Sequence, residues 1–147
     1  MLDAWTSLDL ASVLVPGAWV EEQQEWFKRR SICAFSVRHA DCLRGAYVER
    51  IAVLEALQRV ASRPPRQGTA TVCRDAPWGA AGLRLRAPAT GALTVEDRDA
   101  RVVAAATPLR TDRLWRPYVV YSVDGTTLRL WPTSGATVEC SLRANRR

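Results

Sequence analysis

The sequence predicts a single α+β domain in which two or three N-terminal helices pack on a mostly antiparallel sheet that ends in a three-stranded meander. Its 147 residues suit one domain, its apolar residues recur at helical spacing early and alternate late, and Asp124-Gly125 separates two strand-like runs. We expect one domain over 1–147, mainly helical over 1–62 and mainly β over 69–142. A small β-barrel or sandwich with a helical N-terminal cap is the alternative.

The strongest helical pattern covers residues 41–62. Apolar residues recur there every three or four positions, at Tyr47, Ile51, Leu54 and Leu57. Asp41 offers a side-chain oxygen to the first helical amides. Pro64 ends the pattern, because the residue before a proline is pushed out of helical geometry. The pattern predicts one long helix.

The residues before this helix are more ambiguous. From Leu2 to Leu14 the apolar spacing fits a short helix or an extended arm, and we favour the helix. Pro16-Gly17 predicts a break in the chain. Acidic residues followed by basic ones over 21–30 suit a helix dipole. Ser31 to Val37 fits either a continuation of that helix or a short buried strand.

After residue 62 the apolar period becomes that of strands. Runs bounded by turn residues predict strands at 69–74, 83–87, 92–96, 101–107, 118–123, 126–131 and 137–142. A type I′ turn centred on Asp124-Gly125 would set the pairing of the last hairpin. The expected pairs are Val119 with Leu130, Tyr121 with Leu128 and Val123 with Thr126, whose apolar side chains would face the core.

Composition places the chain among ordinary globular proteins, with 48% hydrophobic and 24% charged residues. The apolar stretch from Leu10 to Val20 is about half the length of a membrane span, and the chain opens without the basic start of a secretory signal. We expect an intracellular protein, or part of a particle assembled in the cytoplasm, with no membrane association.

Four cysteines, Cys33, Cys42, Cys73 and Cys140, lie far apart in a chain large enough to fold without cross-links. This spacing favours buried, reduced thiols. If the protein were exported or part of an extracellular particle, two disulfides could form, and the sequence does not separate the three connectivities.

The patterns that could carry catalysis or metal binding are unspecific. His39, the one histidine, fits the exposed start of a helix, and it forms no tight zinc motif with the cysteines. The carboxylates of 96–99 fit a solvated turn. Residues 79–82 match the GXXG pattern that clamps nucleic-acid backbones, but the flanking helices of that motif are missing. We expect no catalytic residues, no metal and no cofactor.

Arginine and tryptophan provide the remaining functional signal, since both grip phosphates and bases and both anchor protein interfaces. The interaction candidates are Arg74, Trp78, Arg110, Arg113, Trp115, Arg116, Arg129 and Trp131. A basic patch would comprise Lys28, Arg29, Arg30, Arg143, Arg146 and Arg147. The net charge of +6 is almost wholly arginine, which GC-rich coding alone would favour.

The leading hypothesis is a non-catalytic protein–protein interaction or assembly module, such as a small structural component of a viral or phage particle or of another large complex. Protein partners or self-association are therefore expected. The alternative is a nucleic-acid-binding protein that uses arginine and tryptophan contacts. A third hypothesis, an unusual enzyme, depends only on His39 and the carboxylates near Glu96.

Overall fold

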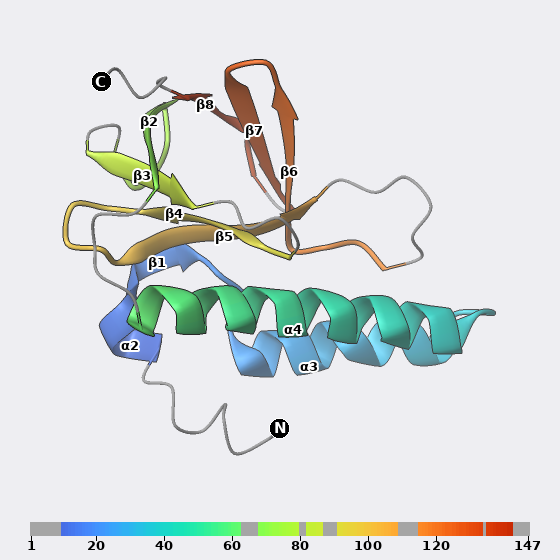
Figure 1. Cartoon of the computed structure of the whole chain (residues 1–147). Helices are drawn as coiled ribbons and strands as arrows, with labels where there is room; N and C mark the ends of the chain where they lie inside the picture. The colour runs from blue at the N-terminus through green and yellow to red at the C-terminus, as the bar shows by residue number, and fades with distance from the viewer. Residues whose placement is uncertain are drawn as a thin grey trace.

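A computed structural model of the chain describes residues 10–62, 68–79, 82–86, 91–108, 115–133 and 135–142. Helices and strands form separate layers: a β-barrel lies on one side, and two helices run side by side beneath it (Figure 1). The mixed α and β composition expected from the sequence is confirmed. The barrel corresponds to the alternative architecture, so the open sheet was wrong.

The helical part contains α2 (Leu10–Val13), α3 (Gln23–Arg30), the 3-10 helix η1 (Ser31–Phe35) and α4 (His39–Ser62). The long helix is confirmed and begins two residues before the expected start. Residues 31–35 continue α3 as a 3-10 turn, with the Ser31 hydroxyl donating to the Phe27 carbonyl at 3.0 Å. α3, η1 and α4 together form a helical hairpin.

The expectation of a short helix within Leu2 to Leu14 is confirmed for the part that the structure describes, because Leu10–Val13 are helical and Leu14 begins a strand. Residues 1–9 lie outside that part, and α2 makes a single turn before β1 (Leu14–Trp19). Pro16 and Gly17 do not break the element but lie inside β1, where its register against β5 shifts. An edge strand tolerates a proline at such an irregularity, and Gly17 adopts a φ of 75° that glycine accommodates.

The remaining strands all lie within about two residues of the expected runs. They are β2 (Thr69–Arg74), β3 (Leu83–Arg86), β4 (Leu93–Glu96), β5 (Val102–Pro108), β6 (Val119–Asp124), β7 (Thr127–Pro132) and β8 (Val138–Leu142). The order is β1-β5-β4-β3-β2-β8-β7-β6, and a parallel pairing of β5 with β6 closes β2 to β8 into a seven-stranded barrel. Closure pairs β5 with β6, whose edges an open sheet would leave exposed, while β1 stays an edge strand beside β5.

The meander β6–β7–β8 is confirmed, but the register of its first hairpin differs from the expected one. Val119 pairs with Pro132, Tyr121 with Leu130 and Val123 with Leu128, so the turn residues are Gly125 and Thr126. Gly125 alone has a positive φ there, 61°, as at the first central position of a type II′ turn. A shift of two residues keeps the same faces, so Leu128 and Leu130 are buried as expected. Val123 is 51% exposed, because the hairpin end extends past the core.

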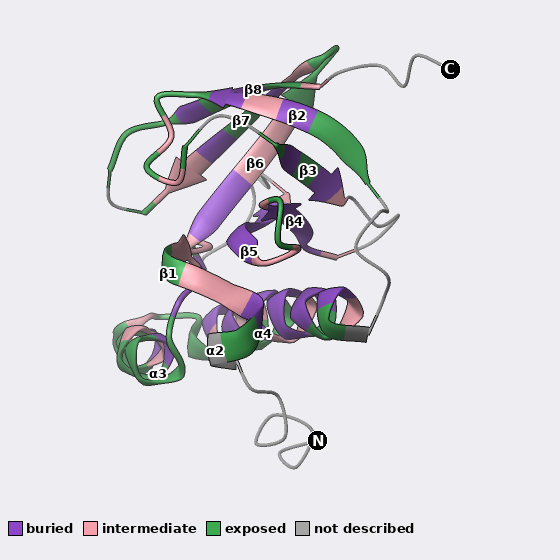
Figure 2. Cartoon of the chain, turned by 90° about the vertical axis from the view of Figure 1, so that its left-hand side faces the viewer, coloured by how far each residue is buried: buried purple, intermediate pink, exposed green. Residues whose placement is uncertain are grey.

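Apolar side chains form one core inside the barrel and a second between α4 and the outer side of β4 and β5. Leu54, Leu57 and Val60 of α4 contribute to the second core and pack with Val102 and Ala105. In Figure 2 α4 carries extensive buried surface, whereas α3 is mainly exposed. The second core therefore fixes α4 to the barrel and leaves α3 on the outside.

All four cysteines are oxidised, in the pairs Cys33–Cys42 and Cys73–Cys140. The expectation of reduced thiols was wrong. Cys73 and Cys140 are direct partners on the adjacent strands β2 and β8, with their Cα atoms 4.0 Å apart. Their separation of 67 residues in the chain hides this contact from sequence reasoning.

Alkylation tests both pairings. Protein purified without reductant and unfolded in guanidinium chloride is expected to take up no iodoacetamide, because no thiol is free. After reduction it should take up four labels, one for each cysteine. Intact-mass spectrometry gives both counts. Labelling before reduction would contradict the pairing.

Candidate interaction site

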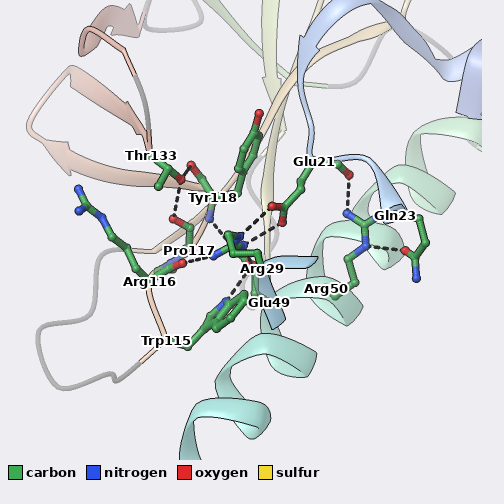
Figure 3. A network of polar contacts seen from close by, with 10 residues as sticks. All are labelled: Glu21, Gln23, Arg29, Glu49, Arg50, Trp115, Arg116, Pro117, Tyr118 and Thr133. Atoms are coloured by element: carbon green, nitrogen blue, oxygen red, sulfur yellow. Dashed lines mark hydrogen bonds and ion pairs between the residues drawn. The ribbon is translucent and has the colours of Figure 1, made fainter. Parts of the chain in front are cut away.

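A polar network joins the helical hairpin to the barrel, and its centre is Glu49 on α4 (Figure 3). Glu49 is only 5% exposed. Its carboxylate accepts hydrogen bonds from Trp115 Nε1 at 3.0 Å and from the backbone N–H of Tyr118 at 2.5 Å. It also binds Arg29 Nη2 at 2.7 Å. One buried side chain thus holds α3 and the chain entering β6.

Arg29 supplies the cation of this network. Its guanidinium binds both carboxylate oxygens of Glu21 at 2.8 Å, the Glu49 carboxylate and the backbone carbonyl of Arg116. It also lies over the Trp115 ring, 4.1 Å from the centroid. Bidentate binding and stacking both use the planar guanidinium, which lysine lacks. Glu21, Arg29 and Glu49 are hereafter called the clamp.

The pKa values in this network follow from burial and charge pairing. Burial raises the pKa of Glu49 above its usual value, although Arg29 and three hydrogen bonds oppose that rise. Burial alone would lower the pKa of Arg29, but Glu21 and Glu49 together raise it. Glu49 therefore depends on Arg29 to carry its charge in this buried position. The carboxylates are occupied by donors of the chain itself, which is the pattern of a structural clamp.

Close packing of Trp115 explains a glycine in the middle of α4. A Cβ at Gly45 would lie 2.6 Å from the Cβ of Trp115, closer than such atoms approach each other. Glycine weakens a helix interior by about 1 kcal/mol relative to alanine. Here its lack of a side chain lets Trp115 lie against the helix and reach Glu49.

Beside the clamp, an open groove of about 720 Å³ lies along α3. Its lining includes Glu22, Glu25, Lys28, Tyr118 and Ile32. Lys28 and Glu25 pair at 3.3 Å, so their charges largely cancel. The groove therefore combines both signs of charge with the apolar side chain of Ile32.

The far end of the hairpin carries the most exposed large apolar side chains in the described part of the chain. Ile32, Phe35 and Val37 are 65%, 90% and 99% exposed. We call these three residues the hairpin tip. Beneath them the buried Cys33–Cys42 disulfide ties η1 to α4, and Arg38 N–H donates to the Ser36 hydroxyl in the connecting turn. In Figure 1 this end of the hairpin extends beyond the strands.

Sequence reasoning missed the hairpin tip, because Ile32 and its neighbours were interpreted as part of a helix or of a buried strand. A usable signal was present in the two cysteines nine positions apart. Apolar residues inside a short disulfide loop have little core to enter, so exposure could have been expected.

Next to the tip, Arg30 lies among aromatic rings. Its guanidinium is 4.9 Å from the Phe27 ring centroid and 5.8 Å from that of Tyr47, and it donates to the Tyr47 hydroxyl at 2.6 Å. Phe27 and Tyr47 are each more than 40% exposed. The three residues form an exposed stack on one side of the hairpin.

The sequence-derived interaction candidates separate in the structure. Trp115 is 4% exposed and belongs to the network, so it offers no ring at the surface. Trp78 is half-buried against Trp19, with ring centroids 4.6 Å apart. The expectation that tryptophans supply the contact surface thus fails for Trp115, while Arg116 beside it is exposed.

Arg74 and Arg129 do come together on the outer face of β2, β8 and β7. Both are cross-strand neighbours of Glu139, which pairs with Arg129 at 3.2 Å. Trp131 follows two positions after Arg129 on the same strand face and is half-buried. This small face contains two cations, one anion and one indole.

The proposed basic patch does not form among the residues that the structure places. Lys28 pairs with Glu25, Arg29 points into the clamp, and Arg30 joins the aromatic stack. The other candidates lie outside the described residues: Arg110, Arg113, Arg143, Arg146 and Arg147.

The weaker candidates take ordinary structural positions. His39 is exposed at the start of α4, as expected. The expectation of a solvated turn at 96–99 was wrong for Glu96, which is buried and paired with Arg86 at 2.5 Å. Asp97 accepts the N–H groups of Asp99 and Arg101 in a tight turn. Within the described ranges no group of three or more His, Cys, Asp or Glu residues is placed to hold a metal. Residues 80 and 81 of the glycine-rich loop lie outside those ranges.

The architecture defines a small disulfide-linked β-barrel that carries a projecting helical hairpin. Comparison with protein-family models, with curated proteins and with solved structures found no match to this chain. No helix of the described ranges has both the length and the apolar character to cross a membrane.

Proposed function

We propose that this protein is a non-catalytic protein–protein interaction module, with the hairpin tip as its contact surface. The observation that carries the proposal is the exposure of Phe35 and Val37, at 90% and 99%. Burying an apolar side chain of this size contributes roughly 1.5–3 kcal/mol. Clustered exposed apolar residues on a folded domain are typical of a binding surface.

Rigidity supports the same proposal. The Cys33–Cys42 disulfide fastens the tip to α4, and the clamp fastens α3 to α4 and, through Arg116 and Tyr118, to the chain entering β6. A surface that is ordered before binding loses less conformational freedom when a partner arrives. The hairpin tip is therefore suited to tight contact despite its small size.

The nucleic-acid alternative has less support. Arg74 and Arg129 share one face, but Glu139 lies between them and neutralises part of their charge. Binding to a phosphate backbone needs several unpaired cations in one surface. A face that carries both signs of charge is better suited to a protein partner than to a phosphate backbone.

Two disulfides bear on where the protein works. Disulfides persist in oxidising surroundings and are rare in the reducing cytosol. We therefore propose non-reducing surroundings for the folded protein, in place of the intracellular location expected from the sequence. Membership of a viral or phage particle stays a prediction.

A triple substitution tests the proposed surface. Replacing Ile32, Phe35 and Val37 with serine is expected to reduce capture of a specific partner from the native source at least tenfold, since each lost apolar contact contributes about 1.5–3 kcal/mol. Quantitative mass spectrometry of affinity captures provides the measurement. Light scattering detects self-association, in which the partner is a second copy of this chain.

Val123→Ser is the matched control, because Val123 is also exposed, at 51%, but lies at the β6–β7 turn. The control should capture the same partner as the unmodified protein. Equal capture by all three proteins would rule out the hairpin tip as the contact surface.

A further inference from the structure

Arg30 is a cation held in place with unused hydrogen-bond donors. Its guanidinium is half-buried among Trp26, Phe27 and Tyr47, and one nitrogen donates to the Tyr47 hydroxyl. A guanidinium carries five N–H donors in a planar fork. Among the described residues no carboxylate pairs with Arg30. The stack therefore presents an oriented, unneutralised cation beside the hairpin tip.

The charged side chains around the hairpin tip leave further positive charge unpaired. Lys28 and Arg38 pair with Glu25 and Asp41, at 3.3 Å and 2.6 Å. Arg44 is exposed and has no carboxylate partner within the described ranges. It lies three residues from Tyr47 along α4, on the same helix side. Positive charge is thus left over on the side of the hairpin that carries the stack.

We propose that the partner is a protein whose contacting segment combines apolar side chains, which cover the hairpin tip, with an Asp or Glu carboxylate that binds Arg30. This inference rests on the proposed function and names the chemistry of its partner. A carboxylate matches the guanidinium fork in a bidentate pair, and the rings of Trp26, Phe27 and Tyr47 hold the guanidinium in place for it. The hairpin tip and the stack then bind the same segment of the partner.

A peptide segment fits these observations better than an anionic lipid surface. Glu25 and Asp41 already pair with Lys28 and Arg38, so the hairpin offers the separate cations Arg30 and Arg44 rather than a broad positive surface for a layer of negative headgroups. A protein segment can place one carboxylate at Arg30 and keep its other charges away. Tyrosine and arginine are also enriched among the residues that dominate protein interfaces.

Selection from a random-peptide display library tests the inference on the full, oxidised protein. We expect the enriched peptides to contain aromatic or aliphatic residues next to Asp or Glu. Fluorescence anisotropy of a selected peptide should show about tenfold weaker binding to Arg30→Gln, with an intermediate loss for Arg30→Lys. Phe35→Ser should weaken it at least as much, and higher salt should weaken it further.

Arg74→Gln is the control, because Arg74 is an exposed arginine on the opposite structural layer. It should change the affinity less than twofold, and circular dichroism confirms the folding of each variant. Binding that depends on Phe35 but not on Arg30, or on peptides without carboxylates, would overturn the acidic partner and leave the proposed function standing. Peptides insensitive to both substitutions would overturn both. Sedimentation with phosphatidylglycerol-containing vesicles that is lost in Phe35→Ser would assign the tip to lipid instead.

Discussion

Replacing Glu49 with alanine is expected to lower the free energy of unfolding by about 3–5 kcal/mol, because one partner of a buried ion pair disappears. Arg29 would keep only Glu21 as its carboxylate partner, and Trp115 Nε1 and the Tyr118 N–H would lose their acceptor. Equilibrium urea denaturation, followed by far-UV circular dichroism, measures the change.

Glu55→Ala provides the control on the same helix. Its carboxylate is 61% exposed and lies 4.0 Å from Arg59 at i,i+4, so its removal should cost less than about 0.5 kcal/mol. Similar losses in the two variants would show that the clamp does not hold the hairpin on the barrel. A large loss in Glu49→Ala alone, with loss of tip-dependent binding, would link the clamp to the contact surface.

Removal of the Cys73–Cys140 disulfide is expected to have a comparable effect. The bond closes a separation of 67 residues and ties β2 to β8 across the barrel. Restoring the conformational freedom of so long a loop to the unfolded chain costs roughly 4 kcal/mol. Both cysteines are replaced with alanine, which is small and apolar and fits their buried positions. Urea denaturation under non-reducing conditions measures the loss in the free energy of unfolding.

The Cys33–Cys42 bond provides the internal comparison, since its separation is only nine residues. The same loop argument gives about 2.5 kcal/mol for its removal. The paired substitution Cys33→Ala and Cys42→Ala should therefore destabilise the protein less than loss of the barrel disulfide. If loss of the Cys33–Cys42 bond destabilised the protein more, β2 and β8 would already be held near each other in the unfolded chain.

Local patterns predicted the secondary structure well after residue 40. The helix at α4 and the runs that became β2 to β8 follow from apolar period and turn residues, which act over a few positions. The failures lie where a distant partner decided the outcome. β1 contains Pro16-Gly17, where a break was expected, and is a strand because it pairs with the distant β5.

Sequence reasoning named residues of the outer barrel face but did not name the hairpin tip. Arg74, Arg129 and Trp131 do share the outer face of the barrel, which follows from strand alternation and cross-strand pairing. Trp115 and Arg29 were expected at the surface, but Arg29 belongs to the clamp and Trp115 donates a hydrogen bond to Glu49. Their partner is Glu49, whose distance along the chain gives no sign of the contact.

The sequence by itself determined the α+β class, the long helix and the terminal meander, because helical and strand periods and the glycine at position 125 are properties of neighbouring residues. Tertiary structure decided the closure of the barrel, the pairing of the cysteines and the exposure of Phe35 and Val37. Barrel closure and the Cys73–Cys140 pair depend on contacts between residues far apart in the chain, and the exposure of the tip depends on its position beyond the strands (Figure 1). Local composition carries no record of either.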